Sequence, residues 1–367
     1  MVIGVPKEIK DNEYRVAIVP SGVKILTGYG HTVLIQSKAG IGSGIPDEEY
    51  QAAGALIVPS AEEVFAKSDI LIKVKEPLPQ EYPLLRTGQV LFTFLHLASN
   101  RSLTEMLMGS GVVAIAYEAV QLEDGTLPIL IPMSEIAGRM APIMATFYLQ
   151  ESQGGSGVLI SGVPGVTSGK VTILGAGTVG QNAARIAVGL GARVVMLDRD
   201  FRHLTYVDTM FDGRITTIAS NENSIEEEVS SSDIVIGAVL IPGARAPFLV
   251  RKELISKMRK GSVIVDVSID QGGCIETSRP TTHSRPIFGV DGVTHYCVVN
   301  MPGAFPRTST FALCNVTIPY IVTLANLGWQ KAVKEDMGLA RGLNVVDGKI
   351  AHPAVATAFG LKYEPFQ

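Results

Sequence analysis

Three glycines and one acid have the types and spacing that a phosphate-binding turn requires. The stretch Gly175-Ala-Gly177-Thr-Val-Gly180 follows an apolar run at 171–174, and a second apolar run ends at Asp198. Gly175 would allow the tight turn, Gly177 would let a pyrophosphate approach the backbone, and Gly180 would let the next helix pack closely. The helix N-terminus offers unpaired N–H groups to phosphates. A strand before the turn, a helix after it and an acid at this distance together predict dinucleotide binding.

The acid also bears on which dinucleotide binds. Asp198 is placed to accept hydrogen bonds from the adenosine ribose, and its charge would repel a 2′-phosphate, which favours NAD over NADP. Arg199 and Arg202 follow closely and carry charges that would weaken this preference. On balance the sequence predicts NAD.

Other residues capable of chemistry lie where predicted strands end. His96 ends one apolar run, Lys73 and Lys75 end another, and Asp270 and Asn300 each follow a further one. Open α/β sheets bind ligands at the carboxyl ends of their strands, so these side chains are candidates for a site.

Taken singly, each candidate also has an ordinary interpretation. A lone histidine is more often a structural hydrogen-bonding residue, and a lysine at a strand end is usually solvated. Arg15, within Asn12-Glu-Tyr-Arg-Val, has the pattern of an exposed turn residue, and the residues alone do not select it.

The elements that must position these residues alternate between strands and helices along the chain. This alternation predicts an α/β fold with mainly parallel sheets covered by helices. Strands are expected at 2–5, 32–36, 70–74, 90–95, 112–116, 171–174, 193–197, 233–236, 262–267 and 296–299, and a hairpin around an Asp-Gly turn at 344–351. Helices are expected at 23–29 and 179–190. Two more are expected to start at side-chain caps: Ser60, in a capping box with Glu63, opens a helix to about residue 67, and Asn100 or Ser99 caps a helix that ends at residue 108.

Two long apolar helices flank the nucleotide-binding stretch. They are expected at 134–153 and 308–327, with probable bends at Pro142 and Pro319. A change of domain is expected in or near the first of them.

Composition excludes several classes of protein. The 367 residues suggest two domains, and the net charge of −4 without a basic block argues against a nucleic-acid partner. No uninterrupted apolar run is long enough for a membrane span, and the N-terminus does not have the pattern of a signal peptide. Cys274, Cys297 and Cys314 contain no Cys-x-x-Cys pair, which favours a reduced, cytoplasmic protein without a structural metal.

Eight segments spread over the whole chain resemble the alanine dehydrogenase family. They are Ile3-Gly-Val-Pro-Lys-Glu, Arg15-Val-Ala, Lys73-Val-Lys-Glu-Pro77, Phe94-Leu-His-Leu-Ala98, Pro132-Met-Ser-Glu-Ile-Ala-Gly138, Gly175-Ala-Gly-Thr-Val-Gly180, Val265-Asp-Val-Ser-Ile-Asp-Gln-Gly-Gly273 and His295-Tyr-Cys-Val-Val-Asn-Met-Pro-Gly-Ala304. The NAD-binding part of proton-translocating transhydrogenases is similar in the opening and in the glycine turn. Those proteins typically lack a histidine at the position of His96.

The resemblance implies two Rossmann-like domains joined by long interdomain helices that act as a hinge. A discontinuous substrate and catalytic domain would comprise residues 1–129 plus 308–367, and an NAD-binding domain would comprise residues 130–307. The family also implies a homohexamer.

The implied reaction is the reversible conversion of L-alanine, NAD⁺ and water to pyruvate, ammonium and NADH. Arg15 would grip the substrate carboxylate, and Lys75 would polarise the carbonyl or imine. His96 would move protons, and Asp270 would stabilise the iminium and the attacking water. The implied physiological role is L-alanine catabolism.

The resemblance also assigns residues that hold the cofactor. Ser134, Asn300 and Met301, together with Met133, resemble residues that hold the nicotinamide. Ser220, Val239 and Leu240 resemble residues that line the adenosine side.

Two other functions stay open at this point. One is an NAD-binding transhydrogenase subunit that docks on a membrane partner, and the other is a dehydrogenase for another small amino acid or 2-oxo acid. The presence of His96 argues against the first, whereas nothing in the sequence sizes the side-chain pocket that would test the second.

Overall fold

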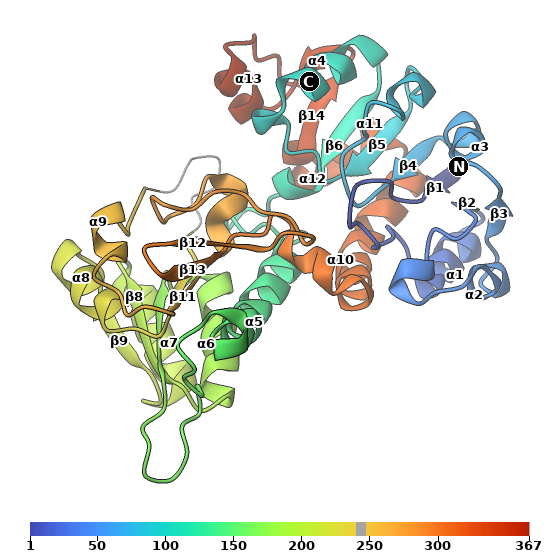
Figure 1. The fold of residues 1–367 in the computed structure, drawn as a ribbon. Coiled ribbons are helices and arrows are strands. Elements are labelled where there is room, and N and C mark those ends of the chain that lie inside the picture. Colours follow the sequence, from blue (N-terminus) through green and yellow to red (C-terminus); the bar gives the residue numbers. More distant parts are fainter. Residues whose placement is uncertain (240–246, 367) are drawn as a thin grey trace. The chain divides into compact units, whose positions relative to one another are not determined.

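The computed structural model describes residues 1–239 and 247–366, so Leu240 lies outside the described residues. The chain divides into two compact units (Figure 1). The first consists of Met1–Met133 and Phe305–Gln367, and the second of Ser134–Ala304.

The first unit is built on an eight-stranded sheet in the order β15-β14-β6-β5-β4-β1-β2-β3. Six strands are parallel, and β14 and β15 extend the β6 edge in antiparallel fashion. The strands are β1 (Val2–Val5), β2 (Thr32–Gln36), β3 (Leu56–Val58), β4 (Ile70–Ile72), β5 (Val90–Thr93), β6 (Val113–Ala116), β14 (Leu343–Val346) and β15 (Lys349–Ile350).

Helices connect these strands, and their ends follow local sequence signals. The Ser60 side chain accepts the Glu63 N–H at the start of one helix, and Asn100 accepts the Leu103 N–H at the start of the next. The helices are α1 (Pro20–Gly28), α2 (Asp47–Ala52), α3 (Ala61–Lys67), α4 (Arg101–Ser110), α10 (Pro306–Leu327), α11 (Trp329–Glu335), α12 (Met337–Gly342) and α13 (Pro353–Phe359).

The second unit has a seven-stranded sheet in the order β12-β13-β11-β10-β7-β8-β9, parallel except for β12. Its strands are β7 (Lys170–Leu174), β8 (Arg193–Asp198), β9 (Thr216–Ala219), β10 (Ile234–Gly237), β11 (Val263–Asp266), β12 (Ile287–Val290) and β13 (Val293–Tyr296). Its helices are α5 (Ile131–Tyr148), α6 (Thr178–Gly189), α7 (Phe201–Phe211), α8 (Glu222–Ser230) and α9 (Lys252–Ile255).

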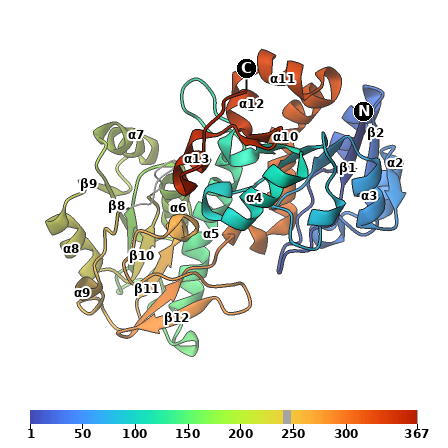
Figure 2. The same cartoon turned by 90° about the horizontal axis from the view of Figure 1, so that it is seen from above.

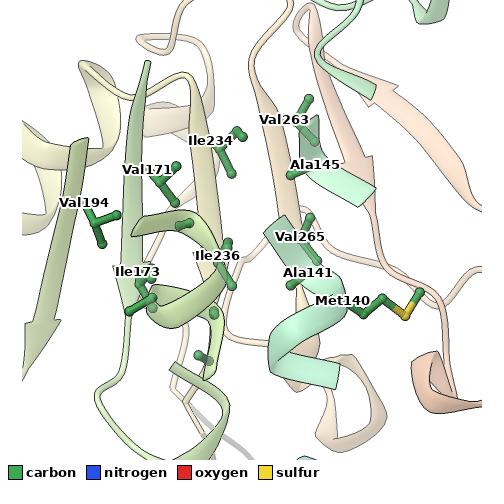
Figure 3. Packing of buried hydrophobic residues seen from close by; sticks show 14 of the residues in the cluster. Met140, Ala141, Ala145, Val171, Ile173, Val194, Ile234, Ile236, Val263 and Val265 are labelled. Carbon is green, nitrogen blue, oxygen red and sulfur yellow. The ribbon is translucent and has the colours of Figure 1, made fainter. Parts of the chain in front are cut away.

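Both faces of this second sheet are buried, which is why its central strands are continuous apolar runs. Helices α5, α6 and α7 cover one face, and α8 and α9 cover the other (Figure 2). Val263 and Val265 lie beside Ala141 and Ala145 of α5 (Figure 3). Residues two apart share a face of a strand, and the small alanines let the helix approach the sheet closely.

The hairpin predicted at 344–351 is confirmed. Strands β14 and β15 pair in antiparallel fashion, and the residues between them have positive φ angles of 50° at Asp347 and 74° at Gly348. Two successive positive φ values define the type of tight turn that matches the strand twist, and Asp-Gly favours that turn.

The prediction of a strand at 296–299 was wrong. Strand β13 ends at Tyr296, and the apolar residues Cys297 and Val298 are buried in the loop that follows it. Because buried loops and buried strands share the same apolar pattern, the sequence did not locate the strand end. Strands β3, β9 and β12 were also missed. The first long helix begins at Ile131 and ends at Tyr148, earlier than expected at both ends.

Helix α10 is long and apolar enough, by length and composition alone, to qualify as a candidate membrane span, although the core helix of a soluble protein meets the same criterion. Within the first unit, Leu313 and Cys314 are buried, and Thr310 accepts the Val16 N–H through its hydroxyl oxygen at 3.1 Å. One side of α10 therefore packs within that unit.

Candidate functional site

The carboxyl ends of the parallel strands of the first unit bring four functional segments to one edge of the sheet. Arg15 lies beyond β1, Lys75 beyond β4, His96 beyond β5 and Glu118 beyond β6. In the chain, β1 is followed by β2 on one side of it, whereas its other neighbour, β4, is followed by β5, so the connections after β1 and β4 leave in opposite directions. Such a switch point is where open α/β sheets bind ligands.

Arg15 is buried, with 2% of its surface exposed, so the expectation of an exposed turn residue was wrong. Its Nε donates to Oε1 of Glu13 at 2.7 Å, and its Nη2 donates to Oε2 at 2.6 Å. Its Nη1 contacts the sulfur of Met133 at 3.2 Å. One carboxylate thus holds the Nε–Nη2 side of the guanidinium, and the Nη1–Nη2 side is the geometry for gripping a second carboxylate.

The two lysines after β4 are also buried rather than solvated. Lys73 is 1% exposed and lies between two carboxylates, 3.2 Å from Glu8 and 2.8 Å from Glu81. Burial raises the pKa of Glu8, whereas its two carboxylate neighbours raise the pKa of Lys73 against the opposing effect of burial. We call Lys73, Glu8 and Glu81 the buried ion triad of the first unit.

The triad fixes the backbone that carries Lys75. Oε1 of Glu8 accepts the N–H groups of Val74 at 2.6 Å and Lys75 at 3.3 Å. The Thr93 hydroxyl donates to the Lys75 carbonyl at 3.0 Å. Lys75 is 8% exposed and lies next to β5, the strand that leads to His96. Lys73 therefore has two structural partners, and the triad holds the segment that carries Lys75 at the carboxyl edge of the sheet.

His96 has a strained backbone and an accessible side chain. Its φ and ψ of 49° and 39° lie in the left-handed region, which costs a non-glycine residue about 1–2 kcal/mol. Its side chain is 45% exposed, and its ring stacks on Phe94 with a centroid separation of 5.8 Å. The carboxylate of Glu118 accepts the His96 N–H at 2.6 Å. An accessible imidazole on a tightly held backbone suits proton transfer.

The glycine turn of the second unit has the geometry of a phosphate cradle. Gly175 has a φ of 106°, and a Cβ there would lie 2.7 Å from the Ala238 carbonyl oxygen. A Cβ at Gly180 would collide with the Gly175 carbonyl oxygen, whereas a Cβ at Gly177 would meet nothing within 4 Å. Gly177 thus leaves open space in front of the N-terminus of α6, where a pyrophosphate would fit.

Asp198 connects this turn to the end of β8. Its carboxylate accepts the Ala176 N–H at 2.7 Å and the Asp200 N–H at 2.8 Å. Arg202 donates to Asp200, which lowers the pKa of Asp200 to about 2. Because Arg202 is already paired with an acid, its charge is less available to a 2′-phosphate.

The other proposed cofactor residues of the second unit lie at the same edge of its sheet or at the start of the unit. Ser220 follows β9, and its N–H donates to the Asp198 carbonyl. Val239 follows β10, and its carbonyl accepts the Ser268 hydroxyl at 2.7 Å. Ser134, in α5, is the first residue of the unit and is half-buried.

Asp270 and Asn300 lie together beyond β11 and β13. The Asn300 N–H donates to Asp270 at 3.3 Å, and Asn300 has a positive φ of 66°. Asp270 is exposed, and Met301, the next residue after Asn300, is buried. The structure therefore brings an exposed carboxylate beside the loop expected to hold the nicotinamide.

A buried acid supports the turn that carries Asp270. The Asp266 carboxylate accepts N–H groups from Ser268 at 3.1 Å, Cys274 at 3.1 Å and Ile275 at 3.2 Å. Burial raises the pKa of Asp266, and these hydrogen bonds oppose that shift. Asp266 therefore ties together both ends of the turn.

Several functional contacts had no signal in the sequence. Glu13 and Glu8 lie in an irregular segment without periodicity, and nothing there marked Arg15 as buried. Glu118 follows a predicted strand, which was the one signal that would have selected it. The three cysteines are buried and free, and the described residues contain no cluster of His, Cys, Asp or Glu that would hold a metal ion.

Comparisons with known proteins match both parts of the chain. The family model of the alanine dehydrogenase/PNT N-terminal domain matches residues 4–137, and that of the C-terminal domain matches residues 141–353. The alanine dehydrogenase of Halomonas elongata is 52% identical over 363 residues, which cover 99% of this chain and 98% of that relative.

Two solved structures also align with nearly the whole chain. An L-alanine dehydrogenase aligns with a TM-score of 0.95 and 53% identity, over 98% of this chain and 99% of that chain. A transhydrogenase from Sinorhizobium meliloti aligns with a TM-score of 0.81 and 27% identity, over 96% of this chain and 100% of that chain.

Proposed function

Because the chain belongs to the alanine dehydrogenase/PNT family, we propose that it is an NAD-dependent L-alanine dehydrogenase. The reaction interconverts L-alanine, NAD⁺ and water with pyruvate, ammonium, NADH and a proton. The observation that carries the proposal is the gathering of two buried cations, Arg15 and Lys75, with the accessible imidazole of His96 at one sheet edge.

The two cations suit a compact substrate with a carboxylate next to a carbonyl. The Nη1–Nη2 side of Arg15 matches a carboxylate, which a planar guanidinium grips with two parallel hydrogen bonds. The Lys75 ammonium, as a compact charge, polarises the adjacent carbonyl or the hydroxyl formed from it. Both groups are buried, so their charges act in a medium that screens them less than water does.

His96 moves the protons of the reaction. Alanine with a neutral amine loses a hydride from Cα to become an iminium, and NAD, when bound, accepts that hydride. His96 then takes a proton from water as the oxygen bonds to the iminium carbon, which gives a carbinolamine. The same imidazole returns that proton to nitrogen, and ammonia leaves as the carbinolamine hydroxyl gives its proton to the imidazole, which forms the carbonyl of pyruvate.

Residues of the second unit would hold the cofactor and steady the positive charge. Gly175, Gly177 and Gly180 would hold the pyrophosphate, and Asp198 the adenosine ribose. Asp270 would stabilise the iminium. The remaining proposed cofactor contacts are Ser134, Ser220, Val239, Leu240, Asn300 and Met301.

Cellular context follows from the same proposal. The enzyme would work in the cytoplasm as a homohexamer, on small-molecule substrates, with neither a nucleic acid nor a membrane as partner. Its role would be L-alanine catabolism.

The test is NADH formation by the purified protein with a panel of L-amino acids, and NADH oxidation with pyruvate and ammonium. Reduction of NAD⁺ by L-alanine above all other amino acids is expected. A preference for another amino acid would identify a different dehydrogenase. Hydride exchange between nicotinamide nucleotides without any amino acid would identify a transhydrogenase module instead.

A further inference from the structure

We propose that Glu118 is the positioning residue of His96, acting on both its backbone and its imidazole. The inference rests on the proposed function, because it concerns the group that moves protons there. Glu118 lies in η4 (Tyr117–Ala119), directly after β6, and reaches across to the residue that follows the neighbouring strand β5.

The backbone part of this role is visible in three contacts. Oε1 of Glu118 accepts the His96 N–H at 2.6 Å and the Leu95 N–H at 3.3 Å, and Oε2 accepts the Leu95 N–H at 3.2 Å. His96 has a left-handed conformation that a residue with a Cβ adopts only when its surroundings impose it. The carboxylate supplies that constraint by holding two successive N–H groups.

The side-chain part of the role follows from the position of the same oxygen. Oε1 of Glu118 lies 3.9 Å from Nδ1 of His96, within ion-pair distance but beyond hydrogen-bond length. The ring is stacked on Phe94, with 3° between the two planes. A carboxylate on the Nδ1 side favours a proton on Nδ1 and leaves Nε2 to exchange protons with the substrate. It also stabilises the imidazolium that forms during proton transfer.

Among the described residues, the charge of Glu118 also acts on one other titratable side chain. It is His352, the residue before α13, which is half-buried. Burial lowers the pKa of His352, and the charge of Glu118 opposes that shift. His352 is therefore neutral near neutral pH.

The first experiment compares Glu118→Gln with the unmodified enzyme. Glutamine keeps the size of the side chain and one acceptor oxygen but removes the charge. We expect kcat for alanine oxidation to fall roughly 10- to 100-fold, as is typical when a group that orients a reacting residue is changed. The KM for NAD⁺ should stay unchanged, because the proposed cofactor contacts lie in other segments. Glu105→Gln is the matched control, since Glu105 is an exposed acid of the same unit paired with Arg101.

The second readout separates positioning from a merely structural role. In the oxidative direction the rate rises with pH as the proton-accepting imidazole becomes neutral. Removing the carboxylate destabilises the imidazolium, so the acid limb of the pH–rate profile should move to lower pH in Glu118→Gln. The same change should appear in the NMR titration of ¹³C-labelled histidine, with the His96 signal assigned by its absence in His96→Gln. His352→Gln should leave that titration in place.

The outcomes are decisive in each case. An unshifted His96 titration and an unshifted acid limb in a folded Glu118→Gln enzyme would overturn the proposal while leaving the proposed function intact. An unmodified protein without alanine-dependent NADH formation would overturn the proposed function, whereas the NMR titration would still test the pairing. If Glu118→Gln does not fold, Glu118→Asp decides, because its carboxylate recedes by one methylene. A normal kcat and acid limb in that variant would count against positioning.

Discussion

The guanidinium of Arg15 is buried and paired, and we propose that it also binds the substrate carboxylate. A buried charge is tolerated when it is paired and hydrogen-bonded, and Glu13 provides that pairing with two short hydrogen bonds. A planar guanidinium can grip a carboxylate with two parallel hydrogen bonds, which is the geometry that the proposed substrate contact requires. A lysine at this position would keep the charge and lose the fork.

This difference makes Arg15→Lys informative. We expect the KM for pyruvate to rise about 10- to 100-fold, which corresponds to the loss of one charge-assisted hydrogen bond, with a smaller change in the KM for NADH. Steady-state kinetics in the reductive direction provide the measurement. Arg101→Lys, on the exposed face of α4, is the control and should behave like the unmodified enzyme. Equal effects on the two KM values would contradict a carboxylate-binding role.

His96 gives the sharper test at the same scale. In His96→Ala we expect kcat to fall by ~10²–10⁴-fold, the usual contribution of a general acid or base. NADH binding, measured by fluorescence titration, should persist, because the glycine turn belongs to a different segment of the chain. Near-native turnover would show that His96 is a structural residue.

Among the elements, the loop after β4 depends most on buried charge. The buried ion triad ties this loop to the segment after β1 and to the start of η2 (Tyr82–Leu84), where Glu81 also accepts the Leu78 N–H at 2.9 Å. Removing the ammonium would leave two carboxylates buried without their counter-ion. That cost is much larger than the cost of losing an exposed ion pair.

We therefore expect Lys73→Met to lower the free energy of unfolding by about 3–5 kcal/mol. Lys67→Met removes a lysine from an exposed pair with Glu63 and should cost about 1 kcal/mol or less. Chemical denaturation followed by circular dichroism measures both. Similar denaturation midpoints for the two variants would mean that the triad contributes little to stability.

We propose that the strand–helix–strand element around the glycine turn determines cofactor choice. Asp198 lies at the end of β8, and its charge would face a 2′-phosphate. We expect Asp198→Gly to reduce the preference for NAD over NADP by about tenfold or more, because a like-charge repulsion of several kcal/mol is removed. The ratio of kcat/KM for the two cofactors is the measurement. Asp208→Asn, which removes an exposed charge from α7, should leave the ratio unchanged.

At the scale of the whole molecule, stability should depend on pH through a buried histidine. His295 lies within β13, with Nδ1 3.1 Å from the Val293 carbonyl and Nε2 2.8 Å from the Thr277 hydroxyl. A carbonyl only accepts, so Nδ1 donates to it, and in the neutral ring Nε2 then accepts the hydrogen of the Thr277 hydroxyl. Burial lowers the pKa of His295 below 6.5. As the pH falls, His295 therefore binds a proton at a higher pH in the unfolded chain than in the folded protein.

The sign of the effect follows from proton linkage. The contribution of His295 is fully present above about pH 6.5 and is lost as the pH falls through its folded-state pKa. We expect the free energy of unfolding to fall between pH 7 and about pH 5, and His295→Asn to flatten the curve by up to ~1.4 kcal/mol per pH unit. His203→Asn, on the half-exposed face of α7, should not flatten it. Parallel curves for all three proteins would exclude this linkage.

The chain assembles each unit differently. The second unit is one continuous segment, whereas the first combines residues 1–133 with residues 305–367, and β14 completes its sheet by pairing with β6. The boundaries that the resemblance implied, at 129/130 and 307/308, lie close to the starts of the two long helices. The chain passes from the first unit to the second between residues 133 and 134, which lie within the first of these helices, α5.

The sequence alone determined the features that depend on neighbours along the chain. The α/β class followed from alternating apolar runs, and the Asp347-Gly348 hairpin and the Ser60 and Asn100 helix caps followed from local backbone preferences. The glycine turn followed in the same way, since strand, turn and helix are consecutive. Each signal is local because the hydrogen bonds that it predicts join residues a few positions apart.

Only the tertiary structure decided which charged groups meet. The pairing of Lys73 with Glu8, the burial of Arg15 and the contact of Glu118 with His96 join segments that follow different strands. The end of β13 also depended on long-range packing, because Cys297 and Val298 are buried outside a strand. Burial and charge pairing depend on which strand ends lie side by side. That arrangement exists only once the strands have taken their order in the parallel sheet.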